Sequence, residues 1–316
     1  PGLHPVCVFS IQQKGRLKPI QTLMQKHFSD GLKTALLVLF LLPAPIQAAP
    51  RVATSDWSTA ETLTAMGHPP VSVGDKRAYG NWVNYPPLPN TTLDAGLRFQ
   101  PNLERLHQIK PDMFIQSPWF AHLKPQFEKV APVREISFAG DKGIAYPQTL
   151  AATRELGSII GDKAAAERLI QQTEKQFQQQ KNTLFPYRKR PLAVVQFVDA
   201  RHLRIYGNTS LFNVVMQKLG LKNAWQGESN AWGFANIALT DLAKLPPDTL
   251  LIIIQPHPRN TRAALDKSAL WQRLPFSKPQ NRRVLPQAWS YGALPSMQRF
   301  ADELAAKLPS EKEIAW

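Results

Sequence analysis

Apolar residues recur at every third position in two short stretches of the chain. The first stretch reads Leu-x-x-Leu-x-x-Ile-x-Pro-Asp over 103–112, and 239–248 repeat it with Leu in place of Ile. An apolar run follows each Pro-Asp pair, at 113–115 and 249–254. This pattern predicts a short helix that leads into a buried strand. Two copies predict two lobes of similar construction whose matching loops face each other across a cleft; the alternative is chance recurrence of a generic amphipathic helix.

Short apolar runs alternate with helical patterns over the rest of the chain. This alternation is typical of α/β proteins with largely parallel sheets. The predicted strands are Pro70 to Val73, Met113 to Gln116, Val133 to Ile136, Leu192 to Val198, Leu250 to Ile254, and Val284-Leu285.

One long helix is predicted between the two halves. Residues 162–184 contain no Gly or Pro, and Leu169, Thr173, Phe177 and Lys181 fall at helical spacing. A helix in this position is a stiff connector, so we expect only small movement of the lobes. The predicted domains are an N-terminal lobe, a connecting helix and a C-terminal lobe, over 49–161, 162–187 and 188–316.

Residues 1–48 have the pattern of a secretory signal peptide. A basic segment after Met24 precedes the apolar run 35–42, and small residues follow up to the expected cleavage site after Ala48. Residues 1–23 are interpreted as an extended or mis-assigned start. The apolar run is shorter than the ~20 residues that span a bilayer, which favours a cleaved signal over the alternative, a membrane anchor.

Composition and charge narrow the function classes. The chain has 316 residues, enough for two cores, with 43% hydrophobic and 19% charged residues, as in globular proteins. Its only cysteine, Cys7, lies in the predicted leader, which excludes thiol catalysis in the exported part. The net charge is +15, but the basic residues are scattered apart from 188–190 and 282–283. We therefore expect no nucleic-acid partner, and interpret the charge as solubility or a mild preference for anionic ligands.

Motifs for catalysis or resident metals are lacking. The chain has no Gly-x-Ser-x-Gly elbow, and 157–163 depart from a phosphate-binding loop in spacing. The histidines are isolated; His202 and His257, for example, have no second ligand at metal-binding spacing. We predict a binding protein with no cofactor and no metal site of its own, with an exported hydrolase of unrecognised type as the alternative.

The loops before the two repeated stretches supply candidate ligand-binding residues. The first, 96–102, carries Arg98, and the second, 232–236, carries Trp232. If the lobes face each other, a cation from one side and an aromatic ring from the other meet the same ligand.

The chain resembles the periplasmic binding proteins of iron-siderophore importers, and most closely those for ferric hydroxamates. The matching segments are Trp82–Pro89, Gly96–Arg98, Pro101–Glu104, Asn223–Gly233 and Trp289–Ala293. The resemblance implies the class III architecture, two α/β lobes with mainly parallel sheets joined by one rigid helix. It also implies a monomer in the periplasm that delivers a ferric siderophore to an ABC permease with its ATPase. A catecholate complex, haem or cobalamin are the alternative cargoes.

The resemblance places Arg98 against the oxygen atoms of the iron chelate, where it could donate two parallel hydrogen bonds. The other implied ligand-binding residues are Trp82, Trp119, Phe120, Asn230, Trp232, Phe234, Trp289 and Tyr291. The alternatives are an ordinary surface ion pair for Arg98 and core packing for each Trp.

Two positions depart from the pattern of the hydroxamate binders. Phe120 stands where they carry a Tyr that assists the arginine, and Gln116 stands near an expected Trp. We therefore expect altered pocket chemistry in the first lobe. For docking to the permease, the resemblance points to one acidic residue on each lobe, and Glu128 and Asp241 are the candidates; the alternative is a solvated surface carboxylate.

Overall fold

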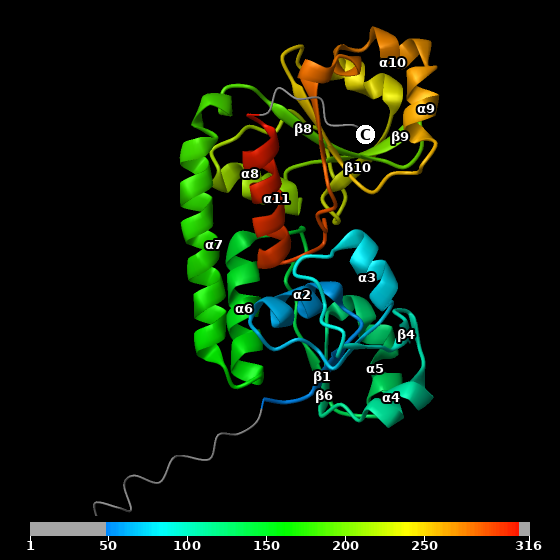
Figure 1. Cartoon of the computed structure of the whole chain (residues 1–316), viewed down its shortest axis with the longest axis vertical. Helices are drawn as coiled ribbons and strands as arrows, with labels where there is room; N and C mark the ends of the chain where they lie inside the picture. The colour runs from blue at the N-terminus through cyan, green and yellow to red at the C-terminus, as the bar shows by residue number, and fades with distance from the viewer. Residues whose placement is uncertain (1–48, 310–316) are drawn as a thin grey trace, which may run out of the picture. The chain divides into compact units, whose positions relative to one another are not determined.

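In the computed structural model, the chain forms two α/β lobes, each built on a five-stranded sheet (Figure 1). The structure describes residues 49–309, and both lobes belong to one compact unit. The predicted leader, 1–48, lies outside the described residues, as does the end of the predicted C-terminal lobe, 310–316. Within the described part, no helix is both long and apolar enough to cross a membrane.

The N-terminal sheet has the order β3-β2-β1-β6-β7, and every neighbouring pair is parallel. Its strands are β1 Val52–Thr54, β2 Ser72–Val73, β3 Leu93–Asp94, β6 Met113–Gln116 and β7 Val133–Glu135. The prediction of a parallel sheet is confirmed for this lobe.

The C-terminal sheet has the order β10-β9-β8-β11-β12 and is mixed. Its strands are β8 Leu192–Phe197, β9 His202–Tyr206, β10 Phe234–Ala238, β11 Leu250–Ile254 and β12 Arg282–Leu285. β8, β11 and β12 run parallel as predicted, whereas β9 is antiparallel to both β8 and β10. The reason is the short connection 198–201, which permits a hairpin but not a crossover.

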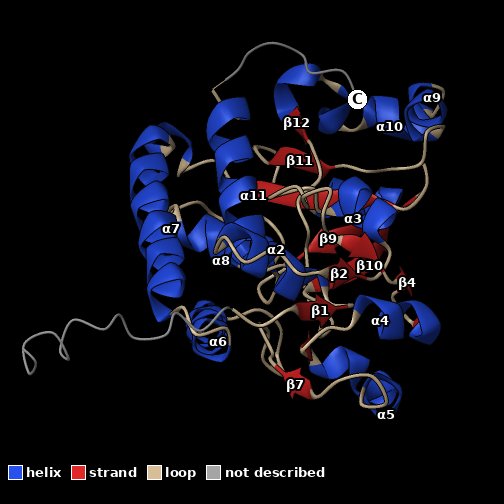
Figure 2. Ribbon diagram, turned by 60° about the horizontal axis from the view of Figure 1, so that its bottom comes forward, coloured by secondary structure: helices blue, strands red, loops and turns tan. Residues whose placement is uncertain are grey.

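Helices cover both faces of the sheets, as Figure 2 shows. The longer α-helices are α2 Trp57–Ala65, α6 Tyr146–Ile159, α7 Lys163–Thr183, α8 Leu211–Lys218 and α11 Leu294–Lys307. The shorter ones are α3 Lys76–Trp82, α4 Leu103–Ile109, α5 Lys124–Phe127, α9 Thr261–Asp266 and α10 Ala269–Arg273. The 3-10 turns are η1 Pro118–Leu123, η2 Phe185–Tyr187, η3 Leu239–Lys244, η4 Pro275–Ser277 and η5 Pro279–Asn281, and a small hairpin joins β4 Gly96–Leu97 to β5 Gln100–Pro101.

Both repeated stretches form the predicted helix and strand. The first gives α4 followed by β6, and the second gives η3 followed by β11. The second helix is a 3-10 turn that ends at Lys244, just before Leu245 and Pro246. Because a residue before proline avoids helical geometry, this boundary follows directly from the sequence.

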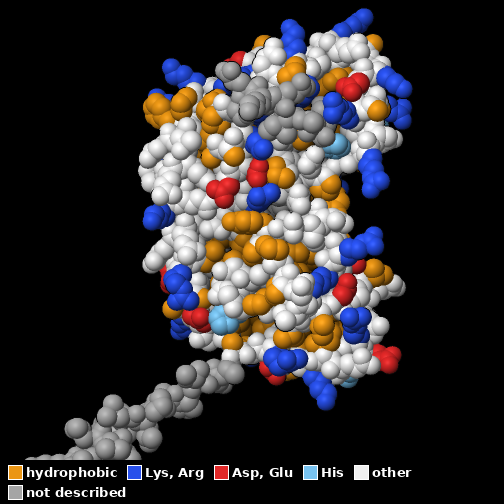
Figure 3. All heavy atoms as spheres, viewed as in Figure 1, with side chains coloured by type: hydrophobic (Ala, Val, Ile, Leu, Met, Phe, Trp, Pro, Cys, Tyr) orange, Lys and Arg blue, Asp and Glu red, His pale blue; other side chains and the backbone are white. Residues whose placement is uncertain are grey.

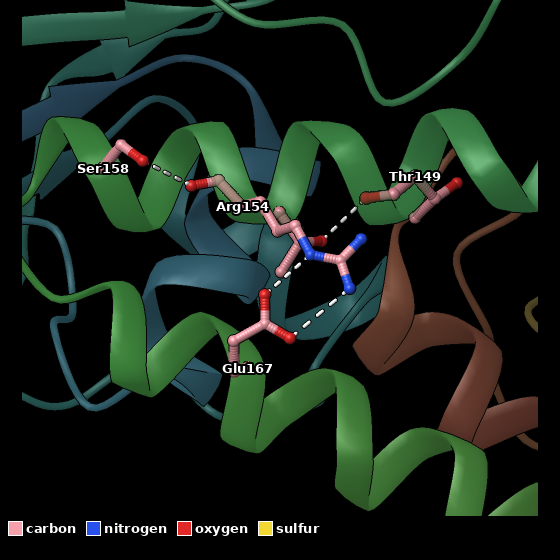
Figure 4. A network of polar contacts seen from close by, with 5 residues as sticks. Thr149, Arg154, Ser158 and Glu167 are labelled. Atoms are coloured by element: carbon pink, nitrogen blue, oxygen red, sulfur yellow. Dashed lines mark hydrogen bonds and ion pairs between the residues drawn. The ribbon is translucent and has the colours of Figure 1, made fainter.

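The predicted long helix is present as α7. Its first turn is capped by Asp162, whose Oδ1 accepts a hydrogen bond from the Ala165 backbone N–H at 2.8 Å. α7 packs against α6 and α11, and Arg154 on α6 forms an ion pair with Glu167 on α7 at 2.6 Å (Figure 4). At 21 residues, α7 is about 30 Å long at 1.5 Å per residue.

A single hydrophobic core extends from one lobe to the other beneath these helices. Val52 and Ile115 contribute from the first sheet, Val194 and Ile252 from the second, and Phe177 from α7. The opposite faces of the two sheets have separate cores. Both lobes therefore contribute to one core under α7, and this common core fixes the lobes to each other.

α2 of the N-terminal lobe also holds the start of α11. The Glu61 carboxylate is fully buried and accepts hydrogen bonds from the backbone N–H groups of Ala293, at 2.6 Å, and Ser296, and from the Ser296 hydroxyl. One turn away, the Ser58 hydroxyl donates to the carbonyl of Tyr291 at 2.7 Å. Burial raises the pKa of Glu61 to about 8, an effect that these hydrogen bonds to the carboxylate oppose.

Candidate functional site

A cavity of about 600 Å³ lies between the lobes, within the range of small-molecule sites. Its walls follow the carboxyl ends of strands in both sheets, where α/β proteins usually bind ligands. The segments after β1, β6 and β7 line it from one lobe, and β9, the residues 231–234 and the segment after β12 line it from the other.

Arg98 projects into the cavity from the turn between β4 and β5. Its Nε atom donates to the carbonyl of Ser55 at 2.9 Å, and its Cζ atom lies 3.9 Å from the centre of the Trp57 ring. Trp57 is fixed in turn by a 2.9 Å hydrogen bond from Nε1 to the carbonyl of Gly74. No acceptor among residues 49–309 pairs with the two terminal nitrogens of Arg98. The side chain is thus immobilised with its fork free for a ligand.

Two carboxylates compensate the charge of Arg98. Burial lowers the pKa of Arg98, and the nearby carboxylates of Asp56 and Asp75 oppose this shift. The Asp75 carboxylate also accepts a hydrogen bond from the Arg98 backbone N–H at 2.9 Å. Arginine keeps its charge in proteins, so the fork remains a cationic donor.

Aromatic rings form a continuous wall from the C-terminal lobe. The Trp289 and Tyr291 rings are 5.0 Å apart, and the Tyr291 and Trp232 rings are 5.4 Å apart, both edge to face. At the end of this row Trp232 meets Trp119 of the other lobe at 4.3 Å. Both of these rings are substantially exposed. Arg98 and Trp232, from the two predicted loops, both line the cavity.

Phe120 lines the cavity on the side of Arg98. Its ring is buried, stacks on Phe99 at 5.3 Å, and lies 5.3 Å from the Arg98 Cζ atom. Phe234 also lines the cavity and is buried.

Three residues of the predicted pocket do not line the cavity. Trp82 is exposed outside the lining, with its ring 6.4 Å from the Trp289 ring. Asn230 shapes the loop instead, since its Oδ1 accepts hydrogen bonds from the backbone N–H groups of Trp232 and Phe234 at 2.9 and 3.3 Å. Gln116 is buried at the end of β6, and its Oε1 accepts from the Ser55 backbone N–H at 2.9 Å. Gln116 therefore lies outside the cavity lining and supports the loop that anchors Arg98.

Polar residues missed by sequence reasoning complete the lining. They are Asp56, Ser58, Ser117, Ser137, Asp141 and Arg204. Most follow strand ends, and Asp56 and Ser58 were overlooked because β1 has only three residues. Arg204 could have been found from the sequence, because it is a cation within the otherwise apolar stretch Leu203 to Tyr206.

The loop 140–144 brings the lobes together beside the cavity. The Ile144 backbone N–H donates to the carbonyl of Thr209 at 2.9 Å. A Cβ atom on Gly143, which has a φ of +104°, would lie 2.5 Å from the same carbonyl oxygen. Position 143 therefore requires glycine, because the backbones of the two lobes approach each other closely there.

The two predicted docking residues differ in their surroundings. Glu128 is exposed and lies 3.9 Å from Lys124. Asp241 accepts a hydrogen bond from the Ala238 backbone N–H at 2.9 Å and pairs with Lys244 at 2.7 Å, interactions that lower the pKa of Asp241. Its carboxylate already has a structural role at the start of η3. On the face shown in Figure 3, charges of both signs are dispersed.

Within residues 49–309, no three His, Cys, Asp or Glu side chains gather in a way that could hold a metal ion. Besides the carboxylates of Asp56 and Asp141, the cavity offers a ligand two arginines, serine hydroxyls and aromatic faces. This arrangement suits a ligand with a compact, electron-rich oxygen surface and an apolar scaffold.

Comparisons with known proteins point to one family. The model of the family described as periplasmic binding protein matches residues 52–288. The iron(3+)-hydroxamate-binding protein FhuD of Escherichia coli (strain K12) is 32% identical over 254 residues, covering 79% of this chain and 84% of that protein.

Solved structures show the same fold. The Fe3+–Desferal-bound siderophore-binding protein FhuD of Vibrio cholerae is similar with a TM-score of 0.76 and 23% identity, over 83% of this chain and 98% of that one. The triscatecholate siderophore-binding protein FeuA of Bacillus subtilis is similar with a TM-score of 0.65 and 16% identity, over 82% and 92% of the two chains.

Proposed function

Because the chain belongs to the periplasmic binding protein family, we propose that it captures a ferric siderophore of the hydroxamate type between its lobes and delivers it to an ABC importer. The similarity to the Escherichia coli iron(3+)-hydroxamate-binding protein supports this cargo. The protein acts in the periplasm by binding and release, as a monomer and without turnover.

The observation that carries the proposal is the state of Arg98. Its Nε atom is fixed on Ser55 and its plane rests on Trp57, so its free fork is held in one orientation before the ligand arrives. Hydroxamate oxygens bound to iron(III) keep partial negative charge and lie close together. They match a planar fork better than a single ammonium group. Pre-organisation of this kind reduces the entropy lost on binding.

The chelator, not the protein, holds the iron in this proposal. The cavity offers Arg98, serine hydroxyls and aromatic rings to the outer surface of the complex. Recognition of the outer surface allows the cargo to be released intact.

Delivery requires a surface that the permease recognises on each lobe. Glu128 is the freer of the two candidate carboxylates, while Asp241 is engaged within η3. Charge of this kind would mainly affect encounter rate and orientation. Reversal of both charges is expected to slow uptake without changing the dissociation constant for cargo; normal transport by the double variant would reject this assignment.

A tryptophan-fluorescence titration tests the cargo. Ferrichrome, a linear ferrioxamine and a ferric catecholate are added in parallel to the purified protein. Trp119, Trp232 and Trp289 line the cavity, so a coloured iron chelate bound there is expected to quench the emission. Saturable quenching by a hydroxamate supports the proposal, and quenching by the catecholate alone would assign the site to another chelate.

The variant Arg98→Gln tests the site itself. Loss of a hydrogen bond from a charged group is expected to cost about 1.5–3 kcal/mol, which is roughly a tenfold to hundredfold rise in the dissociation constant. Arg105→Gln, at an exposed position on α4, is the matched control and should leave affinity unchanged. Equal affinity of the parent and Arg98→Gln would remove Arg98 from the site.

A further inference from the structure

The cavity contains a second arginine, on the lobe opposite Arg98. Arg204 lies on β9, between the buried residues Leu203 and Ile205, and lines the cavity. Its Cζ atom lies 4.7 Å from the centre of the Phe234 ring, a cation–π contact. β9 is paired on both sides, with Gln196 and Asn236 in register with Arg204. A paired strand is a rigid platform, so the cation is fixed in the wall.

The hydrogen-bonding capacity of Arg204 is incompletely used. Its Nε atom is buried without a hydrogen-bond partner. In the part of the chain that the structure describes, no carboxylate forms an ion pair with it. That atom has almost no accessible surface, so a ligand in the cavity would meet other atoms of the side chain.

The two arginines differ in how their charges are compensated. Arg98 lies near the carboxylates of Asp56 and Asp75. Arg204 instead faces aromatic side chains: it hydrogen-bonds to the phenol of Tyr206, and its charge acts on the phenols of Tyr206 and Tyr291. Burial raises the pKa of Tyr206 to about 12, so that phenol stays neutral. Asp141 also lines the cavity, but it is exposed on the loop 140–144, where solvent screens its charge.

The chemistry of iron chelates then separates possible cargoes. In a ferric trihydroxamate the charge of iron(III) is cancelled by its three singly charged ligands, and the complex is neutral. A chelator that replaces one hydroxamate with an α-hydroxycarboxylate gives an anionic complex with carboxylate oxygens at its surface. A carboxylate can accept two parallel hydrogen bonds from an arginine.

We infer that Arg204 is a second anion subsite, which selects anionic ferric siderophores of the mixed hydroxamate–carboxylate class over neutral trihydroxamates. The inference rests on the proposed function and specifies its substrate class. Arg98 holds the oxygens around the metal from one lobe, and Arg204 holds the carboxylate arm from the other. The aromatic wall between them contacts the apolar scaffold.

The test compares dissociation constants for three ferric complexes in parent protein and variants. The probes are ferrichrome, the ferric complex of a citrate-based dihydroxamate, and a ferric tris-catecholate. Arg204→Gln removes the charge, and Arg204→Lys keeps the charge but not the fork. Arg201→Gln, exposed on the same hairpin and outside the cavity lining, is the matched control. Circular dichroism spectra of all variants verify the fold.

The parent is expected to bind the citrate-based complex more tightly than ferrichrome. Arg204→Gln should weaken the citrate-based complex by about tenfold to a hundredfold, the range for loss of a charge-assisted hydrogen bond, and leave ferrichrome unchanged or tighter. Arg204→Lys should retain part of the preference, and Arg201→Gln all of it. Salt should weaken the citrate-based complex in the parent more than in Arg204→Gln.

Three results would overturn the inference. In the first, Arg204→Gln changes the dissociation constant of neither ferrichrome nor the citrate-based complex, or changes both by the same factor. In the second, the tris-catecholate alone depends on Arg204, which would assign the subsite to a different anion. In the third, the parent binds none of the complexes, and only this result also rejects the proposed function. Binding of ferrichrome without any effect of Arg204 would leave the proposed function standing.

Discussion

Phe120 shows how one atom can change a binding site. The side chain lines the cavity beside Arg98 and is held by stacking on Phe99, yet it offers the ligand only an apolar ring. The polar contact with chelate oxygens from this lobe therefore depends on Arg98 and on the serine hydroxyls of the loops. Restoring a hydroxyl at the ring should add a donor without moving the backbone.

Phe120→Tyr is accordingly expected to preserve hydroxamate binding or to tighten it by up to about tenfold, the effect of one hydrogen bond. The fluorescence titration with ferrichrome measures the change. Phe99→Tyr is the matched control, because Phe99 is exposed and does not line the cavity. A large loss of affinity in Phe120→Tyr would mean that the ring is fixed by packing and does not face the cargo.

At the scale of elements, the contact between α2 and α11 positions part of the binding wall. Glu61 holds the first residues of α11, and Ser58 holds the carbonyl of Tyr291. Trp289 and Tyr291 stand directly before that helix. The aromatic wall of one lobe is therefore oriented by a helix of the other.

This contact should make stability depend on pH. Burial raises the pKa of Glu61 from 4.5 to about 8, so the folded protein holds a proton that the unfolded chain loses. The stabilisation that this proton gives the folded protein is complete below the unfolded-state pKa of Glu61. It disappears as the pH rises through the folded-state pKa. The free energy of unfolding should fall between about pH 5 and pH 8, by at most about 1.4 kcal/mol per pH unit from this group.

Urea denaturation of the parent and Glu61→Gln at several pH values measures this dependence. The amide keeps the shape of the side chain but cannot ionise, so the variant should lose this slope while histidines affect both proteins equally. Parallel pH profiles for the two proteins would show that Glu61 is not the responsible group. Glu167→Gln, at an exposed position on α7, serves as the control and should keep the slope of the parent.

The elements were predictable where the local pattern was strong. β6 and β11 match their predicted bounds because a Pro-Asp pair precedes each apolar run. β9 was missed because the predicted strands are continuous apolar runs, whereas polar and apolar residues alternate in β9; β10 was missed because its short pattern follows a glycine-containing loop. The contact of Trp119 with Trp232 and the role of Arg204 depend on pairing between distant segments, which no local pattern encodes.

At the scale of the whole molecule, the shared core restricts how the lobes can move. α7 packs on α6 and α11, and one hydrophobic core continues between the two sheets. Opening the lobes widely would expose that core to water, at about 25 cal/mol for each Å² of apolar surface. Ligand entry must therefore rely on loops and side chains near the cavity, such as Trp119 and Trp232.

Small-angle X-ray scattering with and without a saturating iron chelate tests this restriction. Because the backbone of pre-organised proteins moves by about 1 Å or less on binding, the radius of gyration is expected to stay nearly unchanged. A larger decrease on binding would mean that the lobes close like a hinge and that the packing on α7 is not rigid. A chelate that fails to quench tryptophan fluorescence is the control for effects of the added compound.

The hydrogen bond from Ala293 to Glu61 joins residues that are 232 positions apart in the chain. During synthesis, the first lobe emerges long before the helix that its α2 must contact. Contacts between distant segments close large loops and tend to form slowly. The N-terminal lobe therefore remains incomplete until Ala293 and Ser296 have been made, and this step of folding needs segments of both lobes together.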